Sequence, residues 1–306
     1  MLELFFLGTS ASAPSVHRGL SSQVVSYRDH RFLIDCGEGT QRQILRSGLG
    51  FRRLHRILIT HGHLDHILGL AGLLSTFMRW EAIEELDIWG GAFALERVHD
   101  LLFGVVLRGG KPPIRLNLIP IESGTLFEED GFRVDAFPVA HRGPGCFGFA
   151  FEEPARQPFL VDQADALGVP PGPLRRELVA GHSVTLPDGQ TVRPDQVLGP
   201  LRRGTRLIHV GDCAKTDSLL EVCRDADGLV IEATYLDMEA GLAAEFGHLT
   251  AAQAATLAAE AGVGELFLTH VSRRYHDREV LKEASAIFPR VVVARDFDRH
   301  EIRKPG

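Results

Sequence analysis

Short apolar runs bounded by turn residues recur along the chain, and each of them predicts a β-strand. Eight runs come early and close together, at residues 2–7, 22–27, 31–35, 56–60, 86–90, 114–119, 132–139 and 146–152. Four later runs, at residues 206–210, 228–232, 265–270 and 291–294, alternate with helical segments. This order predicts an α/β protein with two sheets packed together and helices outside.

Two helices are predicted from the residues at their ends. The segment 40–48 begins with Thr40 as an N-cap and stops at Gly48. The segment 250–262 begins with Thr250 and Gln253, which have the spacing of a capping box, and it continues with alanine-rich sequence.

Residues 153–204 differ from the rest because they are rich in proline and glycine and have few long apolar runs. A structureless insert of that length is unusual in a compact domain unless it is functional. We therefore predict a single domain, residues 1–306, with an inserted flexible arm at about 153–204. The arm is expected to carry a small hairpin around "TLPDGQTV".

Composition places the chain among soluble globular proteins. Hydrophobic residues make up 44% and charged residues 24%, and no run of about 18 apolar residues predicts a membrane span. The N-terminus lacks the basic segment of a signal peptide, so a cytoplasmic location is the default expectation. The four cysteines form no C-x-x-C pair, which indicates reduced thiols. Because the net charge is −7, any nucleic-acid binding must rest on local basic patches.

The stretch "LITHGHLDHILGL" places three histidines and an aspartate directly after an apolar strand. His61, His63, Asp65 and His66 cannot all lie on one face of a regular helix, but a loop between a strand and a helix can gather them. Imidazole and carboxylate groups are common zinc ligands, and this spacing suits two neighbouring metals better than one. The alternative is a polar loop with no ligand role.

Further ligand candidates follow other apolar runs: His141, Asp212 and His270. A single histidine after a strand is usually structural, but three such residues together with the first cluster favour a metal site. Two metals about 3.5–4 Å apart can activate water and neutralise charge on a phosphoryl oxygen. The residues therefore predict metal-assisted hydrolysis with Asp212 as the bridge between zinc ions, and manganese could use the same ligands.

The motif "THGHLDH" followed by His141, Asp212 and His270 resembles the metallo-β-lactamase superfamily, which implies an αββα sandwich. Within that superfamily the chain resembles the ribonuclease Z family, including its ribonuclease BN relatives, over essentially its whole length. These are endonucleases that remove the 3′ trailer from precursor tRNA. The narrower match rests on "LFFLGTSASAP", "FLIDCGEGTQRQIL", "IEAT", "FGHLT", "THVSRRY" and "GVPPGPLRRELVAG".

The resemblance implies two zinc ions per subunit. The first would be held by His61, His63, His141 and Asp212, and the second by Asp65, His66, Asp212 and His270. Asp65 would act as the base, Asp35 would support the site, and His248, polarised by Glu232, would protonate the departing 3′ oxygen. The products would be a tRNA with a 3′-hydroxyl and a trailer with a 5′-phosphate. Without the resemblance, Glu232 and His248 could equally be a buried ion pair and a polar residue at a helix start.

The resemblance also implies contacts with precursor tRNA. The residues concerned are Arg18, Gly172, Pro173, Arg175, Arg176, Ser272, Arg274 and Tyr275. The loop "PSVHRG" keeps Arg18 of the family pattern but has Val16 and Gly19 in place of a lysine and an asparagine, so the pattern linked to rejection of CCA-ended tRNA is incomplete. The family further implies a homodimer in which the arm of one subunit reaches tRNA bound to the other.

Two other functions compete with this hypothesis. One is a phosphodiesterase of the same fold that acts on small diesters or on RNA 3′ ends as an exonuclease. The arm argues against it, because a small substrate does not need one. The other is a non-catalytic binding protein that keeps its metals for structure. His248 and the two ligand sets argue against it, because structural sites are usually closed by four ligands of one metal.

Overall fold

The computed structural model describes residues 1–80 and 83–304. The chain divides into two compact units, Met1–Glu152 with Thr205–Gly306, and Glu153–Gly204. Among the described residues, no helix is both long enough and apolar enough to cross a membrane.

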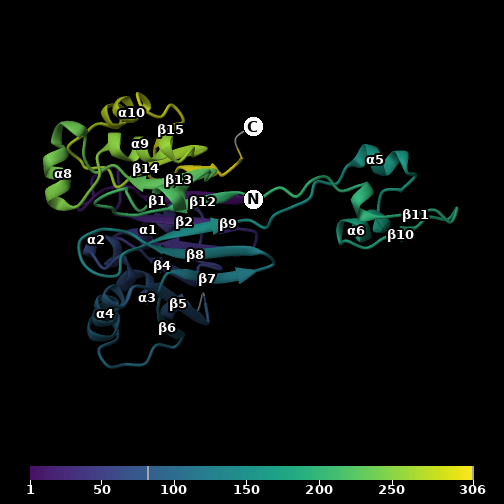
Figure 1. Ribbon diagram of the computed structural model, residues 1–306. Helices are drawn as coiled ribbons and strands as arrows, with labels where there is room; N and C mark the ends of the chain where they lie inside the picture. Colours follow the sequence, from purple (N-terminus) through teal and green to yellow (C-terminus); the bar gives the residue numbers. More distant parts are fainter. Residues whose placement is uncertain (81–82, 305–306) are drawn as a thin grey trace. The chain divides into compact units, whose positions relative to one another are not determined.

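Two seven-stranded sheets form the centre of the first unit (Figure 1). The first has the order β16 (Arg299–Glu301), β1 (Leu2–Gly8), β2 (Ser22–Tyr27), β3 (His30–Ile34), β4 (Arg56–Ile59), β5 (Glu85–Gly90) and β6 (Arg115–Pro120). The second has the order β15 (Val291–Val293), β14 (Glu265–Thr269), β13 (Gly228–Glu232), β12 (Arg206–His209), β9 (Phe147–Glu152), β8 (Phe132–Pro138) and β7 (Gly124–Glu129). Every predicted strand is present, within one residue at each end. The two strands that the sequence did not predict, β7 and β16, lie at sheet edges.

Parallel pairing matters most for the site. In the first sheet β3, β4, β5 and β6 are parallel, and in the second β12, β13, β14 and β15 are parallel. Because β8 and β12 are both antiparallel to β9, β8 runs in the same direction as β12. The carboxyl ends of these strands therefore meet at one edge of their sheet.

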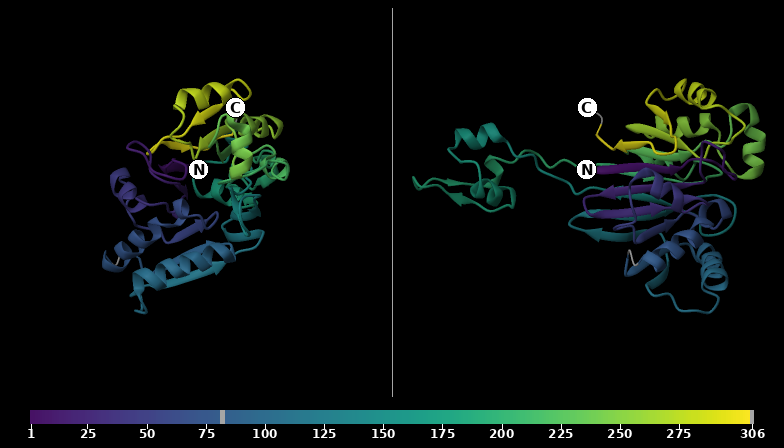
Figure 2. Two further views of the ribbon diagram at one scale, coloured as in Figure 1. Left: turned by 90° about the vertical axis from the view of Figure 1, so that its left-hand side faces the viewer. Right: turned by 180° about the vertical axis from the view of Figure 1, so that it is seen from behind.

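The inner faces of the two sheets share an aromatic core, in which Tyr27 stacks on Phe132 with ring centroids 4.5 Å apart and Phe32 meets Phe151 edge to face at 5.7 Å. Helices cover the outer faces (Figure 2). The first sheet is covered by α1 (Thr40–Ser47), α3 (Gly69–Trp80), α4 (Ala92–His99) and the π-helix η1 (Asp100–Leu107), and the second by α7 (Leu220–Cys223), α9 (Ala251–Glu260) and α10 (Asp277–Ser285). The predicted packing of two sheets with helices outside is confirmed.

Two of the predicted helix ends are confirmed, and one was wrong. Thr250 caps α9 by accepting from the Gln253 backbone N–H, and the capping box is complete. Gly48 ends α1 in the left-handed region at φ 74°. The prediction that Thr40 is the N-cap of α1 was wrong: Gly39 holds that position, and the Thr40 hydroxyl donates to the Gly37 carbonyl instead.

The second unit, Glu153–Gly204, has a core of its own. It contains α5 (Val161–Ala166), α6 (Pro173–Val179), β10 (Val184–Thr185), β11 (Thr191–Val192) and the 3-10 helix η2 (Pro194–Gln196). Its apolar cluster comprises Ala164, Val169, Leu178, Val184, Leu186, Val192 and Val197. The hairpin of β10 and β11 is confirmed, but the two helices were not predicted. The function of the segment as a flexible arm stays a prediction.

Candidate metal centre

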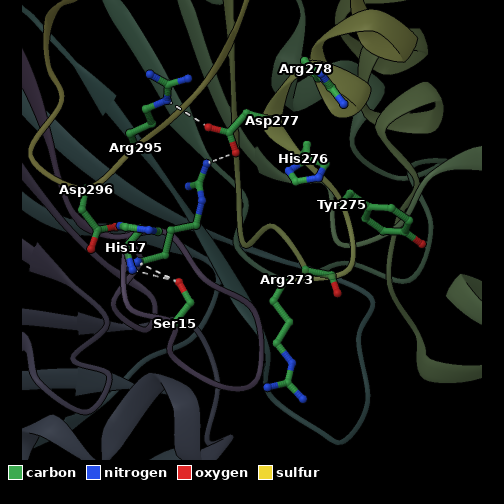
Figure 3. Close-up of a pocket in the computed structure, with 11 residues that line it drawn as sticks. Ser15, His17, Arg273, Tyr275, His276, Asp277, Arg278, Arg295 and Asp296 are labelled. Atoms are coloured by element: carbon green, nitrogen blue, oxygen red, sulfur yellow. Dashed lines mark hydrogen bonds and ion pairs between the residues drawn. The ribbon is translucent and has the colours of Figure 1, made fainter.

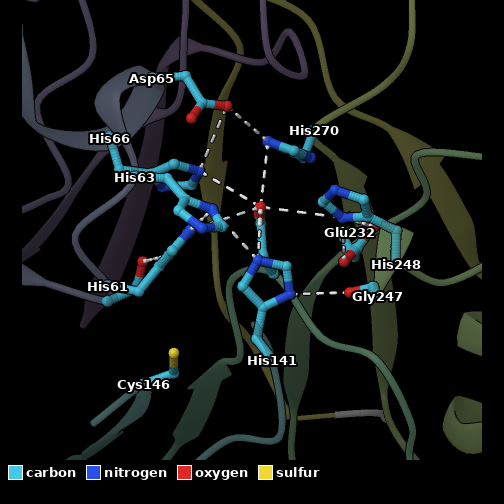
Figure 4. A network of polar contacts seen from close by, with 12 residues as sticks. His61, His63, Asp65, His66, His141, Cys146, Glu232, Gly247, His248 and His270 are labelled. Carbon is cyan, nitrogen blue, oxygen red and sulfur yellow. Dashed lines mark hydrogen bonds and ion pairs between the residues drawn. The ribbon is translucent and has the colours of Figure 1, made fainter. Parts of the chain in front are cut away.

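The predicted ligands follow the carboxyl ends of strands from both sheets. His61 and His63 lie in the loop that follows β4, and Asp65 and His66 lie in the one-turn helix α2 (Leu64–Ile67). On the second sheet His141 follows β8, Asp212 follows β12 and His270 follows β14. Figure 4 shows Asp65 and the five histidines of this set pointing toward one another.

The ligand atoms form two neighbouring groups. His61, His63, His141 and Asp212 each offer an atom within 4.8 Å of the others, and so do Asp65, His66 and His270. The Asp212 Oδ2 atom lies between the groups: it is 3.8 Å from His61 Nε2, 3.9 Å from His141 Nε2, 3.5 Å from His66 Nε2 and 3.4 Å from His270 Nε2. One carboxylate oxygen thus faces four imidazoles from both groups.

Hydrogen bonds orient four of the histidines in the same way. The Nδ1 atoms of His66 and His141 donate to Asp35 Oδ2 at 2.6 Å and to the Gly247 carbonyl at 2.8 Å. Those of His61 and His270 face the hydroxyls of Thr60 at 3.0 Å and Thr234 at 2.9 Å. Both hydroxyls donate to a carboxylate, so they accept from the imidazole. Each ring therefore donates through Nδ1 and turns Nε2 toward the cluster, which leaves Nε2 as the ring nitrogen that would bind a metal.

Asp35 is the buried carboxylate behind this arrangement. Its side chain accepts from the Thr60 backbone N–H and the Thr60 hydroxyl, each at 2.8 Å, in addition to His66. Both Asp35 and His270 have positive φ, at 56° and 52°. Each is the first residue after its strand, so a left-handed residue turns the chain toward the site at both positions.

Glu232 and His248 form a second polar pair beside the ligands. His248 Nδ1 donates to Glu232 at 2.9 Å, and it lies 3.9 Å from Asp212 Oδ2. The fully buried Glu232 also accepts from the Cys213 backbone N–H at 2.7 Å and from the Thr234 hydroxyl at 2.5 Å. His248 follows α8 (Ala240–Phe246), which ends at Gly247 with φ 69°. A side chain at Gly247 would be strained and would meet Arg142, so glycine is required where its carbonyl fixes His141.

The charges in the cluster suit divalent cations. His270 and His66 outweigh the effect of burial and hold the pKa of Asp212 well below its usual value. Burial, with a contribution from His141, lowers the pKa of His63 to about 4, and burial also lowers the pKa of His61. Burial would lower the pKa of His248 as well, but Glu232 raises it to about 9. The site thus combines ionised carboxylates with His61 and His63 as neutral imidazoles. Asp212 and Asp35 outweigh burial and raise the pKa of His66 well above its usual value, as Glu232 does for His248.

Two orphaned atoms show that these residues fit a metal. His66 Nε2 and Asp212 Oδ1 are buried and have no hydrogen-bond partner. Leaving such atoms unpaired costs about 1–3 kcal/mol each, so a ligand is expected to satisfy them. In addition, the facing ring nitrogens His61 Nε2 and His63 Nδ1 are 2.8 Å apart, which requires a proton or a cation between their lone pairs.

Sequence reasoning missed two residues that shape the site. Thr234 belongs to the "IEAT" motif, but the sequence predicts no role for it. In the structure its hydroxyl joins Glu232 to His270. Arg97 on α4 donates to the Gly62 carbonyl at 2.6 Å and so holds the turn between His61 and His63. The motif in the sequence could have pointed to Thr234, but nothing in the sequence connects Arg97 with residue 62.

The predicted RNA-contact residues lie outside the cluster, and several are already engaged. Arg274 and Tyr275 both bind Glu239, Arg175 is paired with Asp165, and Arg18 is paired with Asp277. Ser272 accepts weakly from the Arg274 backbone N–H at 3.4 Å. In the second unit, Gly172 is exposed and has a φ of 125°. Pro173 begins α6, and Arg176 is exposed on that helix.

Comparison with known proteins identifies the relatives of the chain. Ribonuclease Z of Bradyrhizobium diazoefficiens is 49% identical to it over 298 residues, which cover 97% of this chain and 99% of that protein. The chain belongs to the ribonuclease Z family. The crystal structure of human tRNase Z, short form, matches with a TM-score of 0.68 at 27% identity and covers 98% of this chain and 99% of that one.

A second comparison supports the fold. The Bacillus subtilis metallo-beta-lactamase fold protein YhfI matches with a TM-score of 0.68 at 16% identity and covers 98% of both chains. The predicted metallo-β-lactamase fold is therefore confirmed for this member of the ribonuclease Z family. Residues 2–155 also match the family model described as Anti-Pycsar protein Apyc1. That range includes the ligand candidates up to His141 and ends before Asp212.

Proposed function

We propose that the protein is a metal-dependent endoribonuclease that removes the 3′ trailer from precursor tRNA. The observation that carries this proposal is the match to a relative named ribonuclease Z over 97% of the chain, a range too long to omit the second unit. The structural match to human tRNase Z supports the same substrate. Such a substrate implies a cytoplasmic location.

Two divalent cations, zinc in the first instance, fit the cluster. His61, His63, His141 and Asp212 would hold one, and Asp65, His66, Asp212 and His270 would hold the other. When bound, the cations would supply an activated water and would neutralise charge on the scissile phosphate. The position of Asp212 Oδ2, between 3.4 and 3.9 Å from four imidazole nitrogens, supports the place of Asp212 in both ligand sets.

The chain would supply the proton transfers from two sides. Asp65 is ionised, because His270 and His66 outweigh burial and lower its pKa, so its carboxylate can orient or deprotonate the attacking water. His248 is bound to Glu232 through Nδ1 and has a raised pKa, so it can donate a proton to the leaving 3′ oxygen. The products would be a 3′-hydroxyl on the tRNA and a 5′-phosphate on the trailer.

The second unit would bind the tRNA without supplying groups for the chemistry. It contributes none of the ligands, and all groups of the proposed mechanism belong to the first unit. Gly172, Pro173 and the exposed Arg176 are the proposed contacts there, whereas Arg175 is occupied by Asp165 and the Val169 carbonyl. We retain a homodimer, with one subunit's arm on the tRNA of the other, as part of the proposal.

The decisive experiment separates tRNA processing from hydrolysis of small diesters. Residues 160–197 are replaced by two glycines. An isolated antiparallel β-bridge pairs Phe159 with Leu198, so a two-residue turn can join these ends. We expect cleavage of a precursor tRNA to be lost while hydrolysis of bis(p-nitrophenyl) phosphate continues. Intact cleavage of precursor tRNA by this variant would refute the role of the arm. If the full chain yields no discrete 3′ end from precursor tRNA but hydrolyses the diester, the small-diester alternative replaces the proposal.

A further inference from the structure

Arg18 lies in the part of the molecule where RNA contact was predicted, yet its side chain is turned inward. It lines a pocket of about 780 Å³ together with three other arginines. Figure 3 shows these three, Arg273, Arg278 and Arg295. Only 13% of the Arg18 side chain is exposed, whereas Arg273 and Arg278 are exposed residues. The guanidinium groups that a phosphate can reach in this pocket are therefore those of its neighbours.

Three strong bonds hold the Arg18 guanidinium. Its Nη1 donates to the Thr9 hydroxyl at 2.5 Å and to the Ala294 carbonyl at 2.6 Å, and its Nη2 donates to Asp277 Oδ1 at 2.6 Å. Asp277 uses its other oxygen to accept from Arg295 at 2.9 Å. Removing one partner from such a partly buried network leaves charged groups unpaired, which is much costlier than losing a surface ion pair.

Thr9 transmits this anchoring to the segment Thr9–Ser12. Because the Thr9 hydroxyl accepts from Arg18, it donates to Asp296 Oδ1, at 2.8 Å. The other Asp296 oxygen accepts from the Gly19 N–H at 2.6 Å. The Thr9 and Ser10 backbones bond in turn to the Gly19 carbonyl. The loop that carries Arg18 and the segment Thr9–Ser12 are thus fixed to each other and to the chain around residue 295.

The same segment touches two metal-ligand candidates. The Ser12 backbone N–H donates to Asp65 Oδ2 at 3.0 Å. The Thr9 carbonyl accepts from the Val271 N–H at 2.9 Å, and the Ala11 N–H donates to the Val271 carbonyl at 3.2 Å. Val271 directly follows His270, whose Nε2 lies 3.3 Å from the same Asp65 oxygen. Asp65 and His270, both assigned to the second metal, therefore depend on this segment for their placement.

We infer that Arg18 is a positioning residue of the second metal site, which fixes the segment Thr9–Ser12 against Asp65 and the residue after His270. It is not the phosphate contact that its place in the loop suggested; Arg273 and Arg278 fill that role. The inference rests on the proposed function only for its catalytic readout, because metal affinity can be measured without RNA.

The test compares Arg18→Ala with Arg273→Ala, which removes an exposed arginine of the same pocket. Zinc is titrated into each apoprotein against a chelator of known affinity. We expect Arg18→Ala to bind the second zinc at least about tenfold more weakly, as is usual when the support of a ligand is removed, and the first zinc as tightly as wild type. Arg273→Ala is expected to keep both affinities.

Kinetics on precursor tRNA provide an independent readout. Arg18→Ala should lower kcat with little change in KM, and excess zinc should restore part of the rate. Arg273→Ala should raise KM and reduce the salt dependence of binding, with kcat unchanged. Arg18→Lys is expected to behave like Arg18→Ala, because one ammonium group cannot replace a guanidinium that spans three acceptors.

Thermal unfolding of the metal-free variants controls for a loss of structure. If Arg18→Ala does not fold, Asp277→Asn takes its place, since it weakens the same anchor while leaving two of the three Arg18 bonds. Wild-type affinity for both zinc ions in a folded variant, with a rise in KM alone, would overturn the inference. If zinc affinity falls as expected but wild type does not cleave precursor tRNA, the inference stands and the proposed function fails.

Discussion

Replacing Asp35 with asparagine tests how a buried carboxylate controls the metal centre. The Asp35 side chain is fully buried and accepts three hydrogen bonds, two from Thr60 and one from His66 Nδ1. Asparagine has the same shape but only one acceptor atom. If its oxygen stays with the Thr60 backbone N–H, its NH₂ group faces the Thr60 hydroxyl and His66 Nδ1.

That exchange puts a donor against a donor at His66. The ring can relieve the conflict by moving its proton from Nδ1 to Nε2, which is the atom 3.5 Å from Asp212 Oδ2 and 3.7 Å from Asp65 Oδ2. A protonated Nε2 cannot bind a metal ion. A hydrogen bond to a charged group contributes about 1.5–3 kcal/mol, and each 1.4 kcal/mol is about tenfold in affinity. We therefore expect binding of the second metal to weaken by about 10–100-fold.

Chelator competition with zinc measures the two binding steps separately. Asp87→Asn is the matched control: it changes the same functional group, which accepts from Asn117 and lies beside the start of β4, and Asp87 contacts none of the candidate metal ligands. The control should bind both metals as wild type does. Unchanged affinity for both metals in Asp35→Asn would refute the reasoning, and equal loss of both would show that Asp35 supports the fold and not His66 in particular.

Three further predictions concern the same centre. Asp212→Ala should lose both cleavage and at least one of the two zinc ions, and full zinc content in this variant would remove its assignment as the bridge. His248→Ala should slow single-turnover cleavage while both metals stay bound. Glu232 raises the pKa of His248 to about 9 against the effect of burial. The acid form of His248 is present below this pKa, so the wild-type rate should fall as the pH rises toward 9. Bound cations would lower the pKa of His248 and so move this fall in rate to lower pH. The fall should be absent in His248→Ala. Burial raises the pKa of Cys146 to about 11, so iodoacetamide at pH 8 should not label it in the native protein, and rapid labelling would contradict this.

The strands and the ligand candidates could be predicted because both depend on local sequence. An apolar run that ends in a histidine or aspartate marks a strand end, and parallel strands bring such ends to one edge. The cysteines were also judged correctly as free thiols. By contrast, α5 and α6 are only six and seven residues long and lie among prolines and glycines, so they show no usable helical period.

The contacts that occupy the arginines could not be read from the sequence. Arg18 pairs with Asp277, which is 259 positions away in the sequence, and Arg274 pairs with Glu239, which is 35 positions away. A motif gives the identity of an arginine but not the acidic neighbour that tertiary structure supplies. The same limit applies to Arg97, whose bond to the Gly62 carbonyl links an outer helix to the histidine loop.

Each ligand group draws on both β-sheets. His61 and His63 from the first sheet meet His141 and Asp212 from the second, and Asp65 and His66 meet His270. Each cation would therefore cross-link the two sheets, because its ligands are up to about 200 positions apart in the sequence. Cations present at 1,000 times their dissociation constant would stabilise the folded chain by about 4 kcal/mol each. In a cell that is short of metal, the protein would be inactive and would also unfold more easily. The metal supply would thus govern the lifetime of the protein as well as its rate of cleavage.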